Sequence, residues 1–336
     1  MNMTSRTCAT PEQVLEHLRR RIPDFEAARQ PEPLPGGYLN CVWRVPGRPQ
    51  PIIVKVAPPH IAAMPNIPLD PGRIVIEARS LAAFGPRGVL VDVASPAVRP
   101  PRLLDFDEQA HVLVMEDVGT CPDLGTWLRK GGHDEESAGE IGRYLGRFIG
   151  TLHARSHDDA QLAELFDNRT IQRTRLEVQY RAVKDLCVRA GLPDADALGS
   201  EAVALGNLLQ EPGLCVIMGD LWPPSILVTD EADNKHPADN EHPGIRIIDW
   251  ELAHFGRPSQ DVGHLVAHLW MHIHRTPTDQ ATAQVRAALQ DFLTAYRSAL
   301  GEKFGELFGL AGVRESAVHL GAEVLAVACP FCLLTL

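Results

Sequence analysis

Two acidic segments in the second half of the chain carry the strongest chemical signal. Asp220 ends the apolar run LCVIMGD and starts a loop that contains Pro, and Asp249 and Glu251 follow the apolar run IRII. A loop carboxylate such as Asp220 can orient a substrate hydroxyl or accept its proton. Because alternate residues of an extended segment share a side, Asp249 and Glu251 are expected to offer hard oxygen ligands to Mg²⁺ from one face. Turn capping is the alternative for each Asp.

A lysine and a glutamate in the first third of the chain form a second candidate pair. Lys55 is the single charge in IIVKV, and Glu77 lies among apolar neighbours in RIVIEARSL. An isolated charge facing a core is costly, whereas a Lys and a Glu that meet across a strand and a helix compensate each other. Such a pair would leave the ammonium aimed at a phosphate. Alternatively both side chains point to solvent, which is the ordinary place for Lys and Glu.

Helices and strands must position these residues, and they separate into two regions. The first region is mainly extended, with two helices and a Pro-rich loop between them. Its helices are expected at 11–21, with Thr10 as cap, and at 72–84; its strands at 51–57, 102–106 and 111–117; its loop at 58–71. We therefore expect a small mixed sheet in an N-terminal lobe over residues 1–117.

The second region, residues 118–336, reads as a mainly helical C-terminal lobe. Its helical patterns occupy 137–157, 170–190, 195–210, 259–275, 279–300 and 302–327, and its short strands occupy 214–220, 225–229 and 245–250. The expected fold class is α+β with two lobes. The candidate acids all lie at the ends of the short strands, so those strands must bring the chemistry together.

Composition excludes several classes of protein. The 336 residues include 32 Lys plus Arg and 43 Asp plus Glu, so the net charge is −11 and binding to a nucleic-acid backbone is not expected. No apolar run approaches the roughly 20 residues that span a bilayer, and the N-terminus lacks a signal-peptide stretch, so we expect a cytoplasmic protein without a membrane partner. Seven irregularly spaced cysteines are typical of reduced thiols.

The order of these motifs resembles that of the aminoglycoside phosphotransferase and choline kinase-like family, which has a protein-kinase-like fold. The matching features are a glycine turn, a strand Lys, a helix Glu, VLVMED, LHA, GDLxxxSILV and IDWExAxxGxPxxDVG, over residues 35 to about 270. Within the family, GGYLNCVWRV, IVKVAPPHI and Ser225 in place of the usual Asn look most similar to methylthioribose kinase.

This resemblance implies a catalytic and metal-binding loop pair. Asp220 would be the catalytic base, Asp249 the principal Mg²⁺ ligand, and Glu251 and Ser225 secondary contributors near the metal. Asp261 would brace the catalytic loop. In phosphoryl transfer, positioning and charge neutralisation carry nearly all of the catalysis, so these are the residue types that the reaction needs.

The resemblance also implies a nucleotide site for ATP. Lys55 would hold the α- and β-phosphates and pair with Glu77, residues 36–40 would cover the nucleotide, and residues 115–118 would bind adenine through backbone groups. The nucleotide-binding residues implied are Gly36, Gly37, Asn40, Lys55, Glu77, Met115, Glu116 and Val118. The implied function is ATP- and Mg²⁺-dependent phosphorylation of a small-molecule hydroxyl.

Two departures from the family pattern leave an alternative open. Met218 stands where the family usually has His before Gly-Asp, and Ser225 is a poorer metal ligand than Asn. A catalytically silent pseudokinase that binds nucleotide is therefore a second interpretation, beside an active kinase. The acceptor is unassigned: an aminoglycoside, an amino alcohol and a sugar such as methylthioribose are all admissible.

Three further features are weighed for other functions. His264, His268 and His272 share one helical face at a spacing that suits Zn²⁺, but no nearby acid completes the motif, so a packed histidine stripe is expected. Cys329 and Cys332 have redox spacing without the βαβ setting that a redox pair needs. The apolar C-terminus AVACPFCLLTL must pack on its own lobe or on a second subunit, so a homodimer is one of two arrangements.

Overall fold

The structure is a computed structural model of the chain, and it describes residues 9–35, 37–130, 134–229, 244–275 and 278–328. The chain divides into two compact units. Unit 1 comprises Met1–Val91 and Pro100–Thr120, and unit 2 comprises Asp92–Arg99 and Cys121–Leu336. None of the helices in the described ranges combines the length and hydropathy that a membrane span requires.

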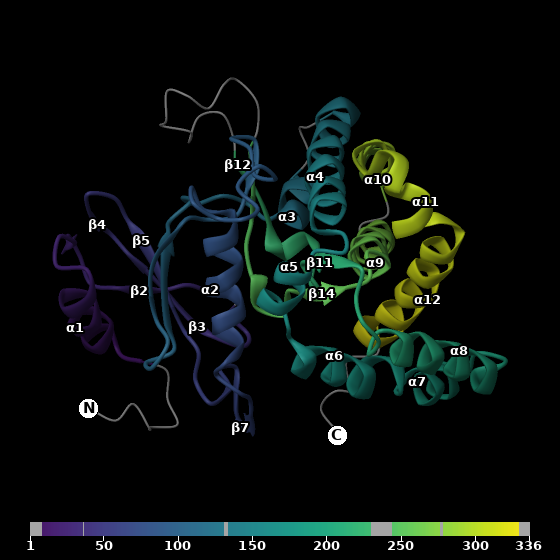
Figure 1. The fold of residues 1–336 in the computed structure, drawn as a ribbon, viewed down its shortest axis with the longest axis horizontal. Helices are drawn as coiled ribbons and strands as arrows, with labels where there is room; N and C mark the ends of the chain where they lie inside the picture. Colours follow the sequence, from purple (N-terminus) through teal and green to yellow (C-terminus); the bar gives the residue numbers. More distant parts are fainter. Residues whose placement is uncertain (1–8, 36, 131–133, 230–243, 276–277, 329–336) are drawn as a thin grey trace. The chain divides into compact units, whose positions relative to one another are not determined.

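Unit 1 is built on a five-stranded sheet with the strand order β2-β3-β5-β10-β9. Strands β2, β3 and β5 of this sheet are labelled in Figure 1. Its strands are β2 (Glu32–Pro33), β3 (Cys41–Val45), β5 (Ile52–Val56), β9 (Leu103–Asp107) and β10 (Val112–Glu116), and every neighbouring pair is antiparallel. β5 is the central strand and is buried along its whole length. β1 (Glu26–Ala27) and β4 (Gly47–Arg48) form a separate two-stranded antiparallel sheet.

Two helices accompany this sheet. α1 (Pro11–Arg21) begins as expected at Thr10, whose hydroxyl accepts from the Gln13 N–H while the Gln13 side chain returns to the Thr10 N–H. α2 (Arg73–Phe84) contacts β9 and β10 and buries Glu77. Val14 and Leu18 of α1 join the apolar cluster on the sheet, so this amphipathic helix is held by its buried face.

The expected loop at 58–71 contains secondary structure. β6 (His60–Ile61) and β7 (Met64–Pro68) form an antiparallel pair, with His60 opposite Pro68. The five prolines of the segment hid this pairing, because Pro removes a ladder donor and is confined to edge strands. The pair is an isolated two-stranded one, in which Pro is tolerated.

Unit 2 is mainly helical. Its helices are α3 (Leu124–Lys130), α4 (Glu135–Ser156), α5 (Ala160–Leu165), α6 (Arg169–Arg175), α7 (Val183–Arg189), α8 (Ala195–Leu208), α9 (Ser259–Arg275), α10 (Asp279–Leu300), α11 (Phe304–Leu307) and α12 (Gly309–Ala328). α4 and α10 pack so closely that a methyl group at Gly142 or Gly146 would overlap with a backbone carbonyl of α10. α12 packs on α9 (Figure 1).

Two expected helices are divided. Residues 170–190 form α6, a π-helical turn η1 (Leu176–Tyr180) and α7, and Tyr180 at the end of the turn is fully buried. Residues 302–327 are split by Phe308 into α11 and α12, and Gly309 has a φ of +50°. Both breaks are set by tertiary packing and by a glycine's access to positive φ, which helical periodicity does not report.

Short strands in unit 2 carry the acidic loops. β11 (Cys215–Ile217) pairs with β14 (His254–Gly256), and β12 (Ile226–Thr229) pairs with β13 (Gly244–Ile247), which also pairs in parallel with β8 (Val98–Arg99). The 3₁₀ turn η2 (Pro223–Ser225) follows Asp220, and the 3₁₀ turn η4 (Trp250–Leu252) follows Asp249 and contains Glu251. The connections Ile217–Ile226 and Ile247–His254 therefore start and end on paired strands, which places them beside each other.

The cysteines follow the expectation in part. Cys187 and Cys215 are free thiols, and burial raises the pKa of both. The sulfur of Cys41 is in a disulfide, so the expectation of reduced thiols is wrong for this residue. Irregular spacing along the sequence cannot report which sulfurs the fold brings together.

Candidate functional site

The predicted Lys–Glu pair is present in unit 1. Lys55 Nζ on β5 lies 2.7 Å from Glu77 Oε2 and 2.9 Å from Glu77 Oε1 on α2. The side chains are only 3% and 1% exposed, so the alternative that both point to solvent is wrong. A buried ion pair with both oxygens engaged compensates the desolvation of both charges. It holds the ammonium in a fixed position on the central strand.

The glycine turn precedes β3 in unit 1. Gly36 lies outside the described residues. A methyl group at Gly37 would overlap with the carbonyl oxygen of Asn40, so the turn is too tight for a side chain at that position. Asn40, the residue before β3, is buried. The turn is thus a compact backbone feature, which is the type of loop that can approach a phosphate closely.

The segment predicted to bind adenine follows the end of β10. Met115 and Glu116 are the last residues of β10 and are buried, and Val118 is half-buried in the extended stretch after it. Arg44 on β3 donates a hydrogen bond to Asp117 Oδ1 at 3.0 Å. This contact ties the stretch to the sheet and fixes the path of its backbone.

The loop that carries Asp220 in unit 2 is fixed by its backbone. Gly219 has a φ of +80°, and a methyl group there would overlap with the Leu252 carbonyl oxygen. The carboxylate of Asp261, in the first turn of α9, accepts from the N–H groups of Met218 and Gly219, both at 2.9 Å. These contacts set the direction in which the chain enters Asp220.

The Asp261 carboxylate is fully buried and also contacts His153, whose Nε2 lies 3.2 Å away. Because an ionised carboxylate only accepts hydrogen bonds, Nε2 of His153 carries the proton, and Tyr296 lies 3.0 Å from its other nitrogen. Burial alone would raise the pKa of Asp261, but the contacts with His153 and the two N–H groups outweigh burial and lower it. The brace implied by the family resemblance therefore has a direct geometric basis.

The carboxylate of Asp220 is positioned from two sides. His264 Nε2 on α9 and Arg175 Nη2 at the end of α6 lie 3.3 and 3.4 Å from Asp220 Oδ1. Arg175 Nη2 also donates to the carbonyl of Gly219. The side chain of Asp220 is 24% exposed, so it is accessible to a small molecule. Arg175 was not singled out from the sequence, where it is one Arg among several in the pattern RTIQRTR.

Asp249 and Glu251 do not lie on an extended segment, so the expectation of a shared strand face is wrong. Asp249 has φ +64° and ψ +58°, and Glu251 lies in the 3₁₀ turn η4. The left-handed residue turns the chain out of the strand, and Asp is among the residues that tolerate this conformation. Asp249 is half-buried and Glu251 is buried.

The two acidic loops nevertheless meet. The Ile248 N–H donates to the Ser225 carbonyl at 2.9 Å, as an extension of the β12–β13 pairing, and Asp249 is the next residue. The Ser225 hydroxyl is fully buried and contacts the carbonyls of Trp222 at 2.9 Å and Asp220 at 3.2 Å. Ser225 thus links the two ends of the Asp220 loop.

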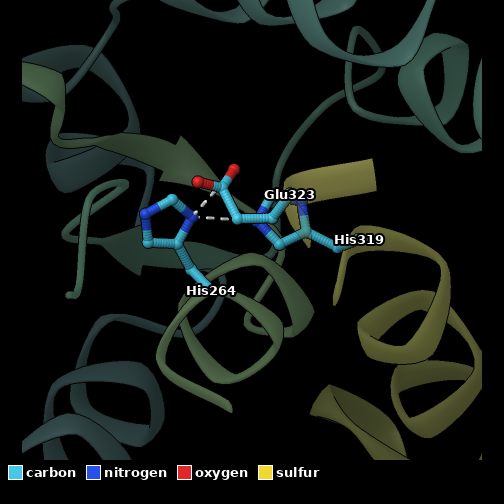
Figure 2. A group of neighbouring side chains, drawn as sticks. All are labelled: His264, His319 and Glu323. Atoms are coloured by element: carbon cyan, nitrogen blue, oxygen red, sulfur yellow. Dashed lines mark hydrogen bonds and ion pairs between the residues drawn. The ribbon is translucent and has the colours of Figure 1, made fainter. Parts of the chain in front are cut away.

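The histidine stripe is divided by the fold. His264 and His268 both contact Glu323 of α12, at 3.6 and 3.0 Å, whereas Nε2 of His272 has no hydrogen-bond partner in the described part of the chain. Figure 2 shows His264, His319 and Glu323 converging from α9 and α12. The acid that the local sequence lacks is Glu323, which lies 55 residues after His268. Burial lowers the pKa of His268 and His272.

Some predictions fall outside this geometry. Cys329 and Cys332 lie outside the described residues, as does most of the apolar C-terminus. The homodimer, the cytoplasmic location and the absence of nucleic-acid binding stay predictions.

Comparison with known proteins identifies the class of protein. The model of the phosphotransferase enzyme family matches residues 31–302, and the chain belongs to this family. The resemblance to aminoglycoside phosphotransferases and choline kinases is confirmed, and so is the two-lobed, kinase-like α+β fold class. The protein is a small-molecule kinase that phosphorylates a hydroxyl.

Individual relatives lie at moderate identity. The 4-hydroxytryptamine kinase of Psilocybe cyanescens is 27% identical over 76% of this chain and 72% of its own length. That of Psilocybe cubensis is 25% identical over 76% and 71%. The solved GDP and kanamycin complex of APH(2")-IIia is similar in fold, with a TM-score of 0.50, 15% identity and coverage of 95% of this chain and 98% of that one.

Proposed function

We propose that this enzyme transfers the γ-phosphoryl group of ATP to a small-molecule hydroxyl with the help of Mg²⁺. The observation that carries the proposal is the junction of the two acidic loops of unit 2. The backbone bond between Ile248 and Ser225 joins them, and Asp261 holds the Asp220 loop by two N–H groups. Phosphoryl transfer needs an oriented base beside charge-neutralising ligands, which this junction supplies.

Asp220 is the candidate catalytic base. Its carboxylate accepts the proton of the acceptor hydroxyl as the hydroxyl oxygen bonds to the γ-phosphorus, and the bond from that phosphorus to the β–γ bridging oxygen breaks to release ADP. His264 and Arg175, both on Oδ1, keep the carboxylate in one orientation. Gly219 and Asp261 keep its backbone in place.

The nucleotide is assigned to residues of unit 1. The Lys55 ammonium, fixed by Glu77, is the candidate contact for the α- and β-phosphates. The turn at Gly37 and Asn40 is the candidate cover for the phosphates, and the backbone of residues 115–118 is the candidate adenine site. The similar solved structure reported above is a complex with GDP, which supports a nucleotide as the donor.

The donor set of unit 2 fits Mg²⁺. Asp249 and Glu251 supply carboxylates, the ligands that this hard cation prefers. Ser225 fits less well, because its hydroxyl is already engaged with loop carbonyls. Bound Mg²⁺ would neutralise the phosphate charge during transfer. Asp249→Ala is expected to remove the Mg²⁺-dependent part of nucleotide affinity, which titration with and without Mg²⁺ measures.

The acceptor is best sought among hydroxylated amines. Two relatives are named 4-hydroxytryptamine kinases, so 4-hydroxytryptamine is the first compound to test. Aminoglycosides, amino alcohols and 5-methylthioribose belong in the same panel. A melting temperature that rises with Mg²⁺-ATP and again with one compound identifies an acceptor class, since a ligand of the native state must stabilise it.

The test of the proposal is ADP release and product phosphorylation by the wild type and by Asp220→Asn. Loss of a general base is expected to lower kcat by about 10²–10⁴-fold, with ATP affinity retained. Asp185→Asn is the matched control, because Asp185 is an exposed carboxylate on α7. Turnover by Asp220→Asn at the wild-type rate would overturn the assignment of the base. ATP binding without transfer to any panel compound would favour the pseudokinase.

A further inference from the structure

The buried cluster between α9 and α12 contains two imidazoles and a carboxylate that face one another (Figure 2). His264 Nδ1 lies 3.3 Å from His319 Nε2 and 3.6 Å from Glu323 Oε2. One ligand atom from each of the three residues lies within 4.8 Å of the others. All three residues are buried. Exposed polar side chains often lie close together by chance, but these three potential metal ligands are buried, so their convergence needs another explanation.

These separations match the edges of a metal coordination polyhedron. Zn²⁺ binds His nitrogen and carboxylate oxygen at about 2.0–2.2 Å, which puts neighbouring ligands of a tetrahedral ion about 3.3–3.6 Å apart. The two distances from His264 Nδ1 fall in this range. The ligand atoms of all three residues lie within 4.8 Å of one another, so one ion can be shared by the three side chains.

The outer atoms of both imidazoles are held by further groups. His319 Nδ1 lies 2.5 Å from the Tyr180 hydroxyl, and His264 Nε2 lies 3.3 Å from Asp220 Oδ1. Metal-ligating histidines typically present their second nitrogen to a carboxylate or another polar group, which fixes the tautomer and the orientation of the ring. Both rings in this cluster meet that requirement.

The carboxylate of Glu323 is also oriented. Gln179 donates to Oε2 at 2.6 Å, and His268 Nε2 lies 3.0 Å from Oε1. Burial alone would raise the pKa of Glu323, but the nearby His264 and His268 outweigh burial and lower it. Burial lowers the pKa of His319 well below its usual range. An ionised carboxylate and a neutral imidazole are the forms that bind a metal ion.

We propose that His264, His319 and Glu323 bind a divalent transition-metal ion, with Zn²⁺ as the preferred ion and the fourth position open to water. Two imidazoles select such an ion over Mg²⁺, which favours all-oxygen sites. The site is therefore separate in chemistry from the one at Asp249. It does not depend on the proposed function.

Metal at this site would affect two parts of unit 2. Binding through Nδ1 of His264 leaves the proton on Nε2, where it donates to Asp220, so the ion would fix the partner of this carboxylate. The ion would also link α9 to α12, which carries two of the three ligands. We expect Zn²⁺ to raise the melting temperature and Mg²⁺ alone not to raise it.

The experiment uses the full chain without an affinity tag, stripped of metal by a chelator and free of nucleotide. Co²⁺ is added first, because tetrahedral Co²⁺ gives intense visible bands and octahedral Co²⁺ gives faint ones. We expect intense bands at one ion per chain, and their displacement by Zn²⁺. Faint bands, or no saturable binding, would overturn the proposal and leave a metal-free hydrogen-bonded chain from Tyr180 to Asp220.

Variants locate the site. Glu323→Gln and His319→Gln are expected to weaken Zn²⁺ binding by more than about 100-fold, since loss of an outer-sphere partner alone costs about 10–100-fold. His274→Gln is the matched control, because His274 is an exposed histidine on the same α9 helix. Unchanged Zn²⁺ affinity in Glu323→Gln would refute the assignment. If a variant fails to fold, the Co²⁺ spectrum of the wild type still decides.

Discussion

Replacing Asp261 by Asn tests whether this buried carboxylate holds the catalytic loop. The native carboxylate accepts from the N–H groups of Met218 and Gly219 and from His153. An Asn side chain keeps one accepting oxygen, but its amide NH₂ must face one of these donors. One buried backbone N–H therefore loses its acceptor, and the remaining hydrogen bonds lose the charge that strengthens them.

The magnitude follows from these losses. An unsatisfied buried N–H costs about 1–3 kcal/mol, and the change from charged to neutral hydrogen bonds costs about 1 kcal/mol more. We expect the free energy of unfolding of unit 2 to fall by about 3 kcal/mol. For a unit of this size, that corresponds to a drop of about 6–12 °C in melting temperature. The kcat should fall while the KM for ATP changes little, since Asp261 acts on the loop of Asp220.

The effect has a defined pH dependence. The pKa of Asp261 is lowered in the folded state from its ordinary value of 3.8, so the unfolded state binds the proton more readily. The stabilisation by the ionised carboxylate is therefore complete above about pH 4 and is lost as the pH falls through the folded-state pKa. The difference in stability between wild type and Asp261→Asn should be constant from pH 7 to pH 5 and should shrink below pH 4.

The assay is urea unfolding followed by circular dichroism at several pH values. Asp291→Asn provides the control, because Asp291 forms a partly exposed ion pair with Arg143 and its loss should cost no more than about 1 kcal/mol. If Asp261→Asn unfolds within about 0.5 kcal/mol of the wild type at pH 7, the brace has no energetic weight and the reasoning is wrong.

Two further substitutions test the backbone and the buried ion pair. Gly219→Ala should lower the free energy of unfolding by at least about 2 kcal/mol, because the new methyl group overlaps with the Leu252 carbonyl and the residue must also adopt a positive φ. Gly191→Ala is the control: its φ is +67° but its surroundings are open, so it should cost about 1 kcal/mol in the same urea assay. Glu77→Gln should cost about 3 kcal/mol by removing the charged partner of the buried Lys55 ammonium. The double variant Lys55→Met with Glu77→Leu should be the more stable of the two, and the reverse order in thermal unfolding would contradict this.

Local signals predicted much of the fold. The helices at 11–21, 259–275 and 279–300 begin and end where the sequence placed them. The caps of the first and third of these helices are short-range: the hydroxyls of Thr10 and Thr278 each accept from the backbone N–H three residues later. The Lys55–Glu77 pair could also be predicted from the sequence, because two opposite charges in apolar segments compensate each other when they are buried together.

The rest depended on contacts between distant segments. The π-helical turn ends at Tyr180, which is buried against His319, 139 residues later. The sequence around Asp249 predicts a continued strand, because its apolar neighbours have strand periodicity. The left-handed backbone conformation of Asp249, which ends the strand, leaves no mark in that pattern. Glu323 completes the histidine cluster from another helix, and no local pattern connects it with His264. Hydrophobic periodicity reports which face is buried and does not report its partner.

The loop before Asp220 bears on how enzymes of this family are recognised as active or inactive. Position 218, usually His, is Met in this chain, and its side chain is fully buried. The contact that this residue makes with Asp261 comes from its backbone N–H, which every residue except proline possesses. A substitution at such a position can change the letters of a motif while the hydrogen bond persists. Loss of the histidine is therefore weak evidence of a dead enzyme, and loss of the acid at 261 would be stronger evidence.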